Sequence, residues 1–183
     1  MVFTAAAMAQ THDSLKENLE QHVRILASDD MRGRLAGSAD AAAAAAYISS
    51  QFEEIGLFPG ADDNGTKSYL QRFELYRNRY ANVVGFIPGS NPELRDEYII
   101  LGAHYDHLGY KVRGNDTIVY HGADDNASGV AVLIETARML KRHEDELART
   151  VIIAAFDAEE AGLYGSEAMA NYICLHPSVL SHT

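Results

Sequence analysis

The stretch that decides the fold class is EYIILGAH, residues 97–104, which is apolar without interruption from Ile99 to Leu101. A second stretch of this kind, RTVIIAAF, occupies residues 149–156. A strand with one solvated face alternates apolar and polar residues, whereas a continuous apolar run of this length is typical of a strand buried on both faces. Both stretches are therefore predicted to be strands in the interior of a covered sheet.

Helix patterns lie before and between these strands. Residues 13–28 repeat apolar side chains along one helical face, and Ser38 is placed to cap a second helix that ends at Gly56. Helices are also predicted for residues 127–143 and 163–177. Three further strands are predicted, at residues 69–75, 81–87 and 117–122. Because helices alternate with buried strands, we predict an α/β fold with a mixed, mostly parallel sheet.

The composition limits the class of protein. The chain has 183 residues, of which 47% are hydrophobic and 22% are charged, as is typical of one globular domain with its own core. Its formal net charge of −11 argues against nucleic acid or an anionic membrane as the main partner. The single cysteine, Cys174, excludes a disulfide framework and a multi-cysteine zinc site, and we interpret it as a small apolar residue of a helix.

The first nine residues, MVFTAAAMA, resemble the second half of a secretory signal peptide. Their short apolar run ends in Ala7-Met8-Ala9 before Gln10, which fits the A-x-A cleavage pattern, although no basic segment precedes it. We therefore predict a signal-peptide remnant at residues 1–9 and a domain at residues 10–183. The protein is predicted to be exported, to the periplasm or the extracellular space.

Three segments place carboxylates or imidazoles beside small residues at the ends of predicted core elements: HYDHLG (104–109), GADDNASG (122–129) and DAEEAGLYGS (157–166). In α/β sheets, ligands bind at the carboxyl ends of strands, and two of these segments follow the apolar strands. Unpaired carboxylates are costly to hold there, and the segments contain few basic residues, so a divalent metal is the better compensating charge. Imidazole and carboxylate ligands without thiolate suit zinc, or else manganese or cobalt.

The spacing within these segments suggests roles for individual side chains. His104 and Asp106 are two positions apart, so on an extended strand they point to the same side. Asp106 can therefore orient the imidazole, or both side chains can bind metal. Adjacent Glu159 and Glu160 point in different directions, so one can hold metal while the other acts on a bound water as general base.

In this order, the three segments resemble the signature of the M28 family of zinc peptidases, the co-catalytic aminopeptidases. MRGRLAGS (31–38) and EEIGLFPG (53–60) also resemble the N-terminal part of that family. The resemblance implies a three-layer α/β/α sandwich around a mixed sheet, as in other zinc exopeptidases, and a site with two zinc ions. It also implies a peptide substrate with a free N-terminus, from which one residue is removed at a time.

The same resemblance implies three metal ligands, His104, Asp125 and Glu160. Asp125 corresponds to the ligand that bridges the two metals, and the family has a cis peptide bond at the position of Asp125–Asn126. Glu160 corresponds to a ligand of the other metal. These assignments rest on the motifs and on no other feature of the sequence.

Two further carboxylates have roles by resemblance. Asp106 corresponds to the carboxylate that orients His104, and Glu159 corresponds to the general base. Asp124 and His107 have no metal role in the family, and we interpret them as hydrogen-bonding residues of their loops.

The chain departs from the family pattern after Glu160. The family site has five protein ligands, and the last two are an Asp after a later strand and a His near the end of the domain. The segment after Glu160 contains no Asp, and His176 is interpreted as a helix-capping residue. We therefore expect an incomplete M28 domain that lacks its C-terminal part, and leave open whether it is active by itself and how it oligomerises.

Two alternatives remain open from the sequence. One is an enzyme similar to glutaminyl cyclases, which share the fold and use one zinc, although His104 in HYDHLG favours the peptidase. The other is a non-catalytic remnant that only binds metal or folds with a partner. Assays of peptide hydrolysis, pyroglutamate formation and metal content separate the three.

Overall fold

A computed structural model describes the backbone of residues 3–175 and the side chains of residues 14–173. Its centre is a sheet of five strands: β1 (Phe58–Pro59), β4 (Leu70–Leu75), β5 (Asn78–Ile87), β6 (Tyr98–His104) and β9 (Thr150–Phe156). The strands lie in the order β1–β5–β9–β6, and β4 also pairs with β5. The predicted strands at residues 69–75, 81–87, 97–104 and 149–156 are therefore confirmed.

Strand direction follows from the connections. A two-residue turn at Tyr76 and Arg77, both with positive φ, joins β4 to β5 as an antiparallel hairpin. The connection from β6 to β9 passes through a long helix, and such a crossover brings the two strands together in parallel. The sheet is thus mixed, as predicted. For the described strands the expectation that it is mostly parallel is wrong, because β6–β9 is the one parallel pair among the four pairings within this sheet.

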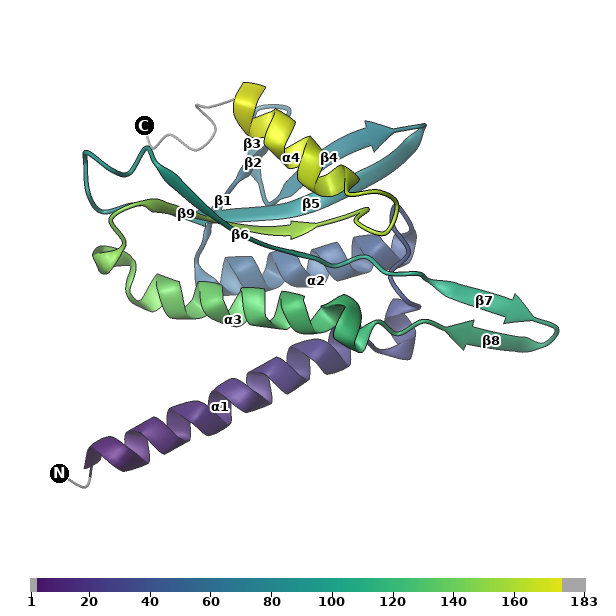
Figure 1. Ribbon diagram of the computed structural model, residues 1–183, viewed down its shortest axis with the longest axis horizontal. Coiled ribbons are helices and arrows are strands. Elements are labelled where there is room, and N and C mark those ends of the chain that lie inside the picture. The colour runs from purple at the N-terminus through teal and green to yellow at the C-terminus, as the bar shows by residue number, and fades with distance from the viewer. Residues whose placement is uncertain (1–2, 176–183) are drawn as a thin grey trace.

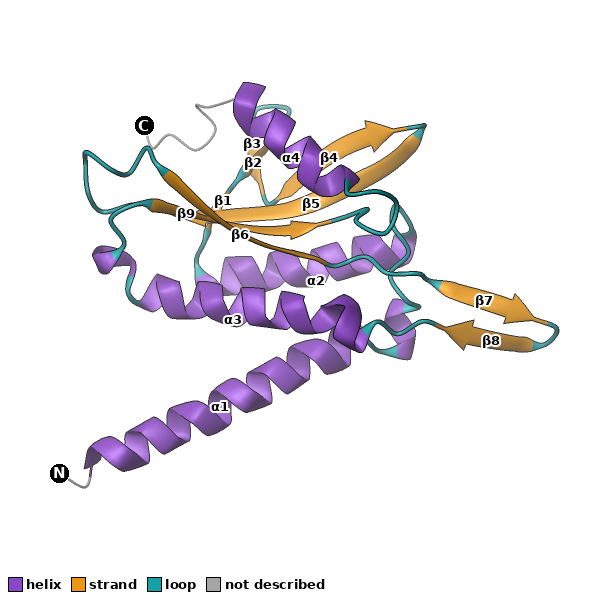
Figure 2. Ribbon diagram, viewed as in Figure 1, coloured by secondary structure: helices purple, strands orange, loops and turns teal. Residues whose placement is uncertain are grey.

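Helices cover both faces of this sheet (Figures 1 and 2). On one side lie α2 and α3, with α1 packed against α3, and on the other side lies α4. The helices are α1 (Phe3–Leu26), α2 (Ala39–Ile55), α3 (Ser128–Arg142) and α4 (Tyr164–Leu175). The three-layer α/β/α sandwich is therefore confirmed.

Alternation along the strands divides the core in two, because successive side chains of a strand point to opposite faces. In β9, Ile153 joins the core cluster that also contains residues of α2 and α3. Its neighbour Ile152 packs in a second cluster with Met169 of α4. The uninterrupted apolar run of β9 is therefore explained by burial on both faces, as predicted.

The helix α2 shows how local sequence sets an element's limits. The side chain of Ser38 accepts a hydrogen bond from the backbone N–H of Ala41 at 3.1 Å, as predicted for a cap. Gly56 ends the helix with φ of 82°, a conformation that favours glycine. Between them the alanines pack closely, since Ala44 and Ala45 are buried against the sheet layer.

Two other predictions need correction. The first helix begins at Phe3 and not near residue 13, because the alanine-rich start has high helix propensity and continues the same helix.

The strand β6 is not buried on both faces. Ile99 and Ile100 are 47% and 50% exposed, and among the described strands β6 pairs with β9 alone. An apolar run indicates that a strand is suited to burial, but the cover has to come from other elements.

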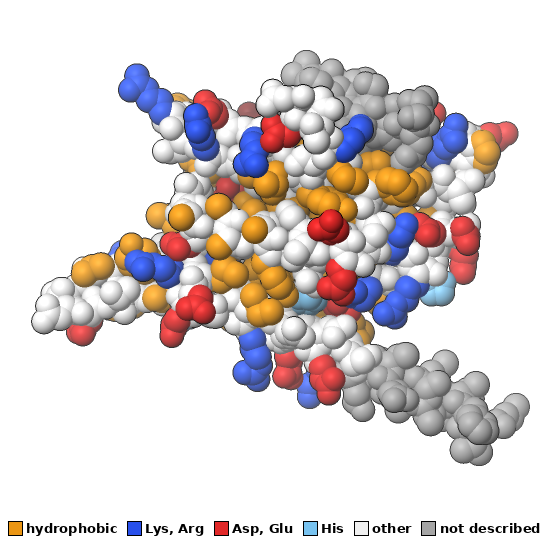
Figure 3. Space-filling model, turned by 180° about the vertical axis from the view of Figure 1, so that it is seen from behind, with side chains coloured by type: hydrophobic (Ala, Val, Ile, Leu, Met, Phe, Trp, Pro, Cys, Tyr) orange, Lys and Arg blue, Asp and Glu red, His pale blue; other side chains and the backbone are white. Residues whose placement is uncertain are grey.

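Two short hairpins and three single turns complete the described chain. The strand predicted at residues 117–122 is β8, which forms a hairpin with β7 that projects from the body (Figure 1). Seen from behind in Figure 3, this hairpin lies at the left and carries exposed apolar side chains, among them Val112, which is 65% exposed. The remaining elements are β2 (Ala61–Asp63), β3 (Thr66–Ser68), β7 (Tyr110–Arg113), β8 (Asp116–Val119), two 3₁₀ turns (Asp29–Met31, Glu144–Glu146) and a π-type turn (Ala123–Ala127).

Among the described residues, no helix has both the length and the apolar character that crossing a bilayer requires. The signal-peptide prediction for residues 1–9 stays a prediction, because the side chains of this segment lie outside the described part. The interpretations of Cys174 and His176 also fall outside the described side chains.

Candidate metal centre

The parallel pair β6–β9 brings two of the three predicted segments together. His104, the last residue of β6, lies opposite Phe156, the last residue of β9. The two strands therefore deliver their following loops to the same edge of the sheet. One loop carries Asp106 and His107, and the other carries the adjacent glutamates 159 and 160.

The third segment is the turn before α3, and it is folded against the loop after β6. Gly122 has φ of 57°, and a Cβ atom there would lie 2.4 Å from the carbonyl oxygen of Asp125 and 2.6 Å from the His107 ring. Only glycine therefore permits this approach. The peptide bond Asp125–Asn126 is cis, as the resemblance implied. The side chain of Asn126 then accepts a hydrogen bond from Gly129 N–H at 3.1 Å, at the start of α3.

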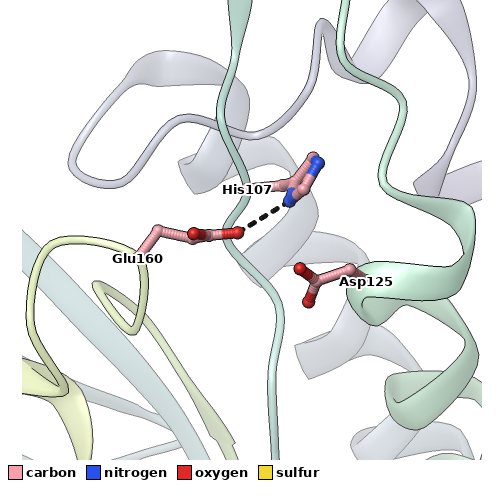
Figure 4. Close-up of side chains that lie close together, drawn as sticks. All are labelled: His107, Asp125 and Glu160. Carbon is pink, nitrogen blue, oxygen red and sulfur yellow. Dashed lines mark hydrogen bonds and ion pairs between the residues drawn. The ribbon is translucent and has the colours of Figure 1, made fainter.

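Side chains from all three segments converge. His104 Nε2 lies 3.1 Å from Asp125 Oδ1 and 4.0 Å from Glu159 Oε2. His107 Nδ1 lies 2.8 Å from Glu160 Oε1. Figure 4 shows His107, Asp125 and Glu160 turned toward one another, and their potential ligand atoms all lie within 4.8 Å of one another. One imidazole nitrogen and two carboxylate oxygens at such distances could hold a divalent metal.

His107 is predicted from the sequence to be a hydrogen-bonding residue of its loop, and its contact with Glu160 agrees with that prediction. It also belongs to the group that could hold a metal, a role that the sequence does not predict for it. The predicted ligand His104 is not in that group, although it contacts Asp125 directly. The available signal was a second histidine three positions after the first. Its meaning depends on how the loop turns, which spacing alone does not reveal.

Asp106 is fully buried and connects the two loops. Its carboxylate accepts hydrogen bonds from the backbone N–H groups of Glu159 at 3.0 Å and Glu160 at 3.2 Å. One of its oxygens also lies 3.7 Å from His104 Nδ1. Asp106 raises the pKa of the His104 imidazole, burial acts in the opposite direction, and Glu159 adds to the rise. A metal at His104 would therefore compete with a proton.

Asp157, the first residue after β9, is a buried carboxylate beneath the same loops. Burial raises its pKa to about 6, against the backbone N–H groups of Ala81 and Ala158, which donate to it at 3.2 Å and 2.8 Å and lower the pKa. Proximity to Asp106 raises the pKa further. Tyr105 also contacts Ala81, because its hydroxyl donates a hydrogen bond to the Ala81 carbonyl at 2.6 Å.

A cavity of about 320 Å³ opens beside the convergent side chains. His104, Asn126 and Glu159 form its polar side. Phe156 and Leu163 contribute apolar surface. This combination of an apolar wall with a few convergent polar groups is typical of small-molecule sites.

Residues 82–181 match the family model described as peptidase family M28. The glutamate carboxypeptidase 2 homolog of Caenorhabditis elegans is 40% identical over 114 residues, which cover 60% of this chain and 13% of that protein. Leucine aminopeptidase 1 of Trichophyton equinum is 30% identical over 162 residues, which cover 86% of this chain and 40% of that protein.

Among solved structures, LapB from Legionella pneumophila is similar with a TM-score of 0.63 and 28% sequence identity. The similarity covers 91% of this chain and 42% of LapB. The chain thus spans less than half the length of each of these three proteins.

Proposed function

Because the chain belongs to peptidase family M28, we propose that it acts as a zinc-dependent aminopeptidase, which hydrolyses N-terminal residues from peptides. The observation that carries this proposal is the convergence of His104, His107, Asp125, Glu159 and Glu160 from three separate segments. Because the chain spans 42% of LapB, that it has the activity of a whole enzyme is itself proposed. Metal binding by this chain is therefore the first point to test.

The side chains fit zinc in type. His107, Asp125 and Glu160 supply one nitrogen and two oxygen donors, and His104 supplies a further nitrogen beside Asp125. We propose a site for two zinc ions, which Asp125 would hold together with His104 and Glu160. When bound, zinc supplies a Lewis acid that polarises a carbonyl and lowers the pKa of a water molecule.

Glu159 is the proposed general base. Its side chain is 38% exposed and lines the cavity, so a substrate and a water molecule can reach it. The carboxylate would take a proton from the attacking water and pass it to the leaving amine. Asp106 fixes the backbone of Glu159 through the 3.0 Å hydrogen bond, so that the carboxylate is held beside His104.

The surroundings of the cavity favour a peptide with a free N-terminus. The carboxylate of Glu159 lines the cavity and is 38% exposed, so it creates a negative field that attracts an ammonium group. Phe156 and Leu163 offer apolar surface to the side chain of the first residue. We therefore propose cleavage after an apolar N-terminal residue.

The test is hydrolysis of leucine p-nitroanilide and of its N-acetylated form, with zinc and after chelation. We expect release from the free-amine substrate only, and only with zinc. Glu159→Gln should lower kcat by about 10² to 10⁴-fold while zinc binding is retained, as loss of a general base does. Zinc binding without hydrolysis of either substrate would leave a metal-binding remnant as the function. Pyroglutamate formation from a glutaminyl peptide would favour the cyclase alternative.

A further inference from the structure

Arg34 is fully buried and heads the group of largest fully buried side chains among the described residues. Its guanidinium donates only to main-chain carbonyls in the described structure. Nε donates to Tyr105 at 2.7 Å, Nη2 to Gly122 at 2.9 Å, and Nη1 to both His121, at 2.8 Å, and Leu26. Within residues 14–173, Arg34 forms no ion pair with a carboxylate.

Three of these four carbonyls, those of Tyr105, His121 and Gly122, belong to or adjoin the segments that carry the candidate ligands, and the fourth belongs to Leu26 at the end of α1. Tyr105 lies between His104 and Asp106, in the loop after β6. His121 and Gly122 immediately precede the turn that carries Asp125. One rigid guanidinium therefore ties together two segments that are distant in sequence, in a fork geometry that an ammonium group cannot reproduce.

The main chain around Arg34 makes the same connection. The carbonyl of Arg34 accepts a hydrogen bond from His107 N–H at 3.1 Å, and Leu35 forms a parallel bridge with His107. A Cβ atom at Gly33 would lie 2.1 Å from the carbonyl oxygen of Gly109, so the loop is packed tightly against this segment. Arg34 has φ of 48°, which is unusual for a residue with a side chain and is often found at functional sites.

The charge of Arg34 is placed beneath the acidic groups of the centre. Burial lowers the pKa of its guanidinium, and the carboxylates of Asp106 and Asp125 oppose that change. A buried cation without a direct ion pair is costly, so it persists where hydrogen bonds and nearby opposite charges compensate. Three of the four hydrogen bonds that the guanidinium donates, and the two nearby carboxylates, come from the segments of the candidate metal centre or the residue next to them.

Resting on the proposed function, we infer that Arg34 is a positioning residue of the metal centre. It holds the loop after β6 and the turn before α3 so that His104, His107 and Asp125 converge, and it contacts neither metal nor substrate. Arg34 thereby increases the affinity of these ligands for zinc.

The experiment measures zinc affinity of the 183-residue protein by competition with a chromophoric chelator. Arg34→Lys keeps the positive charge but loses the forked hydrogen bonds of the guanidinium, so the variant protein should bind zinc about tenfold more weakly. Arg34→Met loses the charge and the hydrogen bonds, so this variant should bind zinc about 100-fold more weakly. The matched control is Arg138→Lys. Arg138 is a largely buried arginine of α3 that donates to Glu135, Glu54 and Gln51, and its replacement should leave zinc affinity unchanged.

A second measurement needs no variant and remains valid if Arg34→Met does not fold. Zinc should slow amide hydrogen exchange in the wild-type protein at residues 31–35, because this loop is bonded to the ligand segments. Unchanged zinc affinity in both Arg34 variants overturns the inference, and so does zinc binding that leaves exchange at residues 31–35 unaffected. Failure of the wild-type chain to bind zinc overturns the proposed function, and this inference with it.

Discussion

Asp157 makes the stability of the protein depend on pH in a direction opposite to that of most carboxylates. Its side chain is 2% exposed, and burial raises its pKa from 3.8 to about 6. A raised pKa means that the folded protein binds this proton more tightly than the unfolded chain does. The contribution of protonated Asp157 to the free energy of unfolding is therefore fully present below pH 3.8, and it is lost as the pH rises through about 6.

The size of the effect follows from the shift. A rise of roughly two pKa units corresponds to about 3 kcal/mol, of which about 2 kcal/mol falls between pH 4 and pH 7. Asp157→Asn cannot ionise, so the free energy of unfolding of the wild type should fall by this amount relative to the variant as the pH is raised. The assay is urea denaturation of both proteins at pH 4, 5, 6 and 7.

The control is Asp96→Asn, at an exposed position between β5 and β6. Its unfolding free energy should follow that of the wild type at every pH. If the curves of the wild type and Asp157→Asn run parallel from pH 4 to pH 7, burial does not raise the pKa of Asp157 and the reasoning fails. A wild type that gains stability relative to Asp157→Asn with rising pH would show the opposite sign.

Three substitutions at the centre and one feature of the N-terminus give further tests. Asp106→Asn places an amide donor against a backbone N–H, so the free energy of unfolding should fall by about 1–3 kcal/mol in urea denaturation. Gly122→Ala forces a Cβ atom to within 2.4 Å of a carbonyl oxygen, so the melting temperature should fall, and a variant as stable as the wild type would contradict the geometry. His107→Ala should weaken zinc binding at least tenfold in chelator competition if this imidazole is a ligand, whereas unchanged affinity would limit it to a hydrogen bond with Glu160. If the protein is exported, N-terminal sequencing of the mature form should begin at Gln10, and a mature form that retains residues 1–9 would refute the cleavage site.

The features that sequence alone predicted are those with a local signal. Ser38 and Gly56 mark the ends of α2 because capping chemistry is local to the chain. The apolar runs at residues 97–104 and 149–156 identified two strands, and the crossover through a helix makes such strands parallel. Because parallel neighbouring strands end at the same edge of a sheet, the sequence also predicts that the loops after these two strands lie close together.

The features that sequence did not predict depend on distant partners. The antiparallel pairing of β5 with β9 is decided by residues about 70 positions apart, and no local pattern reports it. The exposure of Ile99 and Ile100 depends on which elements cover β6. The place of His107 depends on its backbone contacts with Arg34 and Leu35, which bend the loop toward Glu160.

The balance of charge at the centre explains why these carboxylates point toward a cation site. Asp106 is satisfied by backbone N–H groups and lies near the buried guanidinium of Arg34. The other three carboxylates form ion pairs with histidine alone among the described residues: Asp125, Glu159 and Glu160. Histidine is a weaker counter-charge than a divalent cation, because it carries at most one charge and carries it only when protonated. A divalent cation therefore compensates these three carboxylates better than the histidines that contact them.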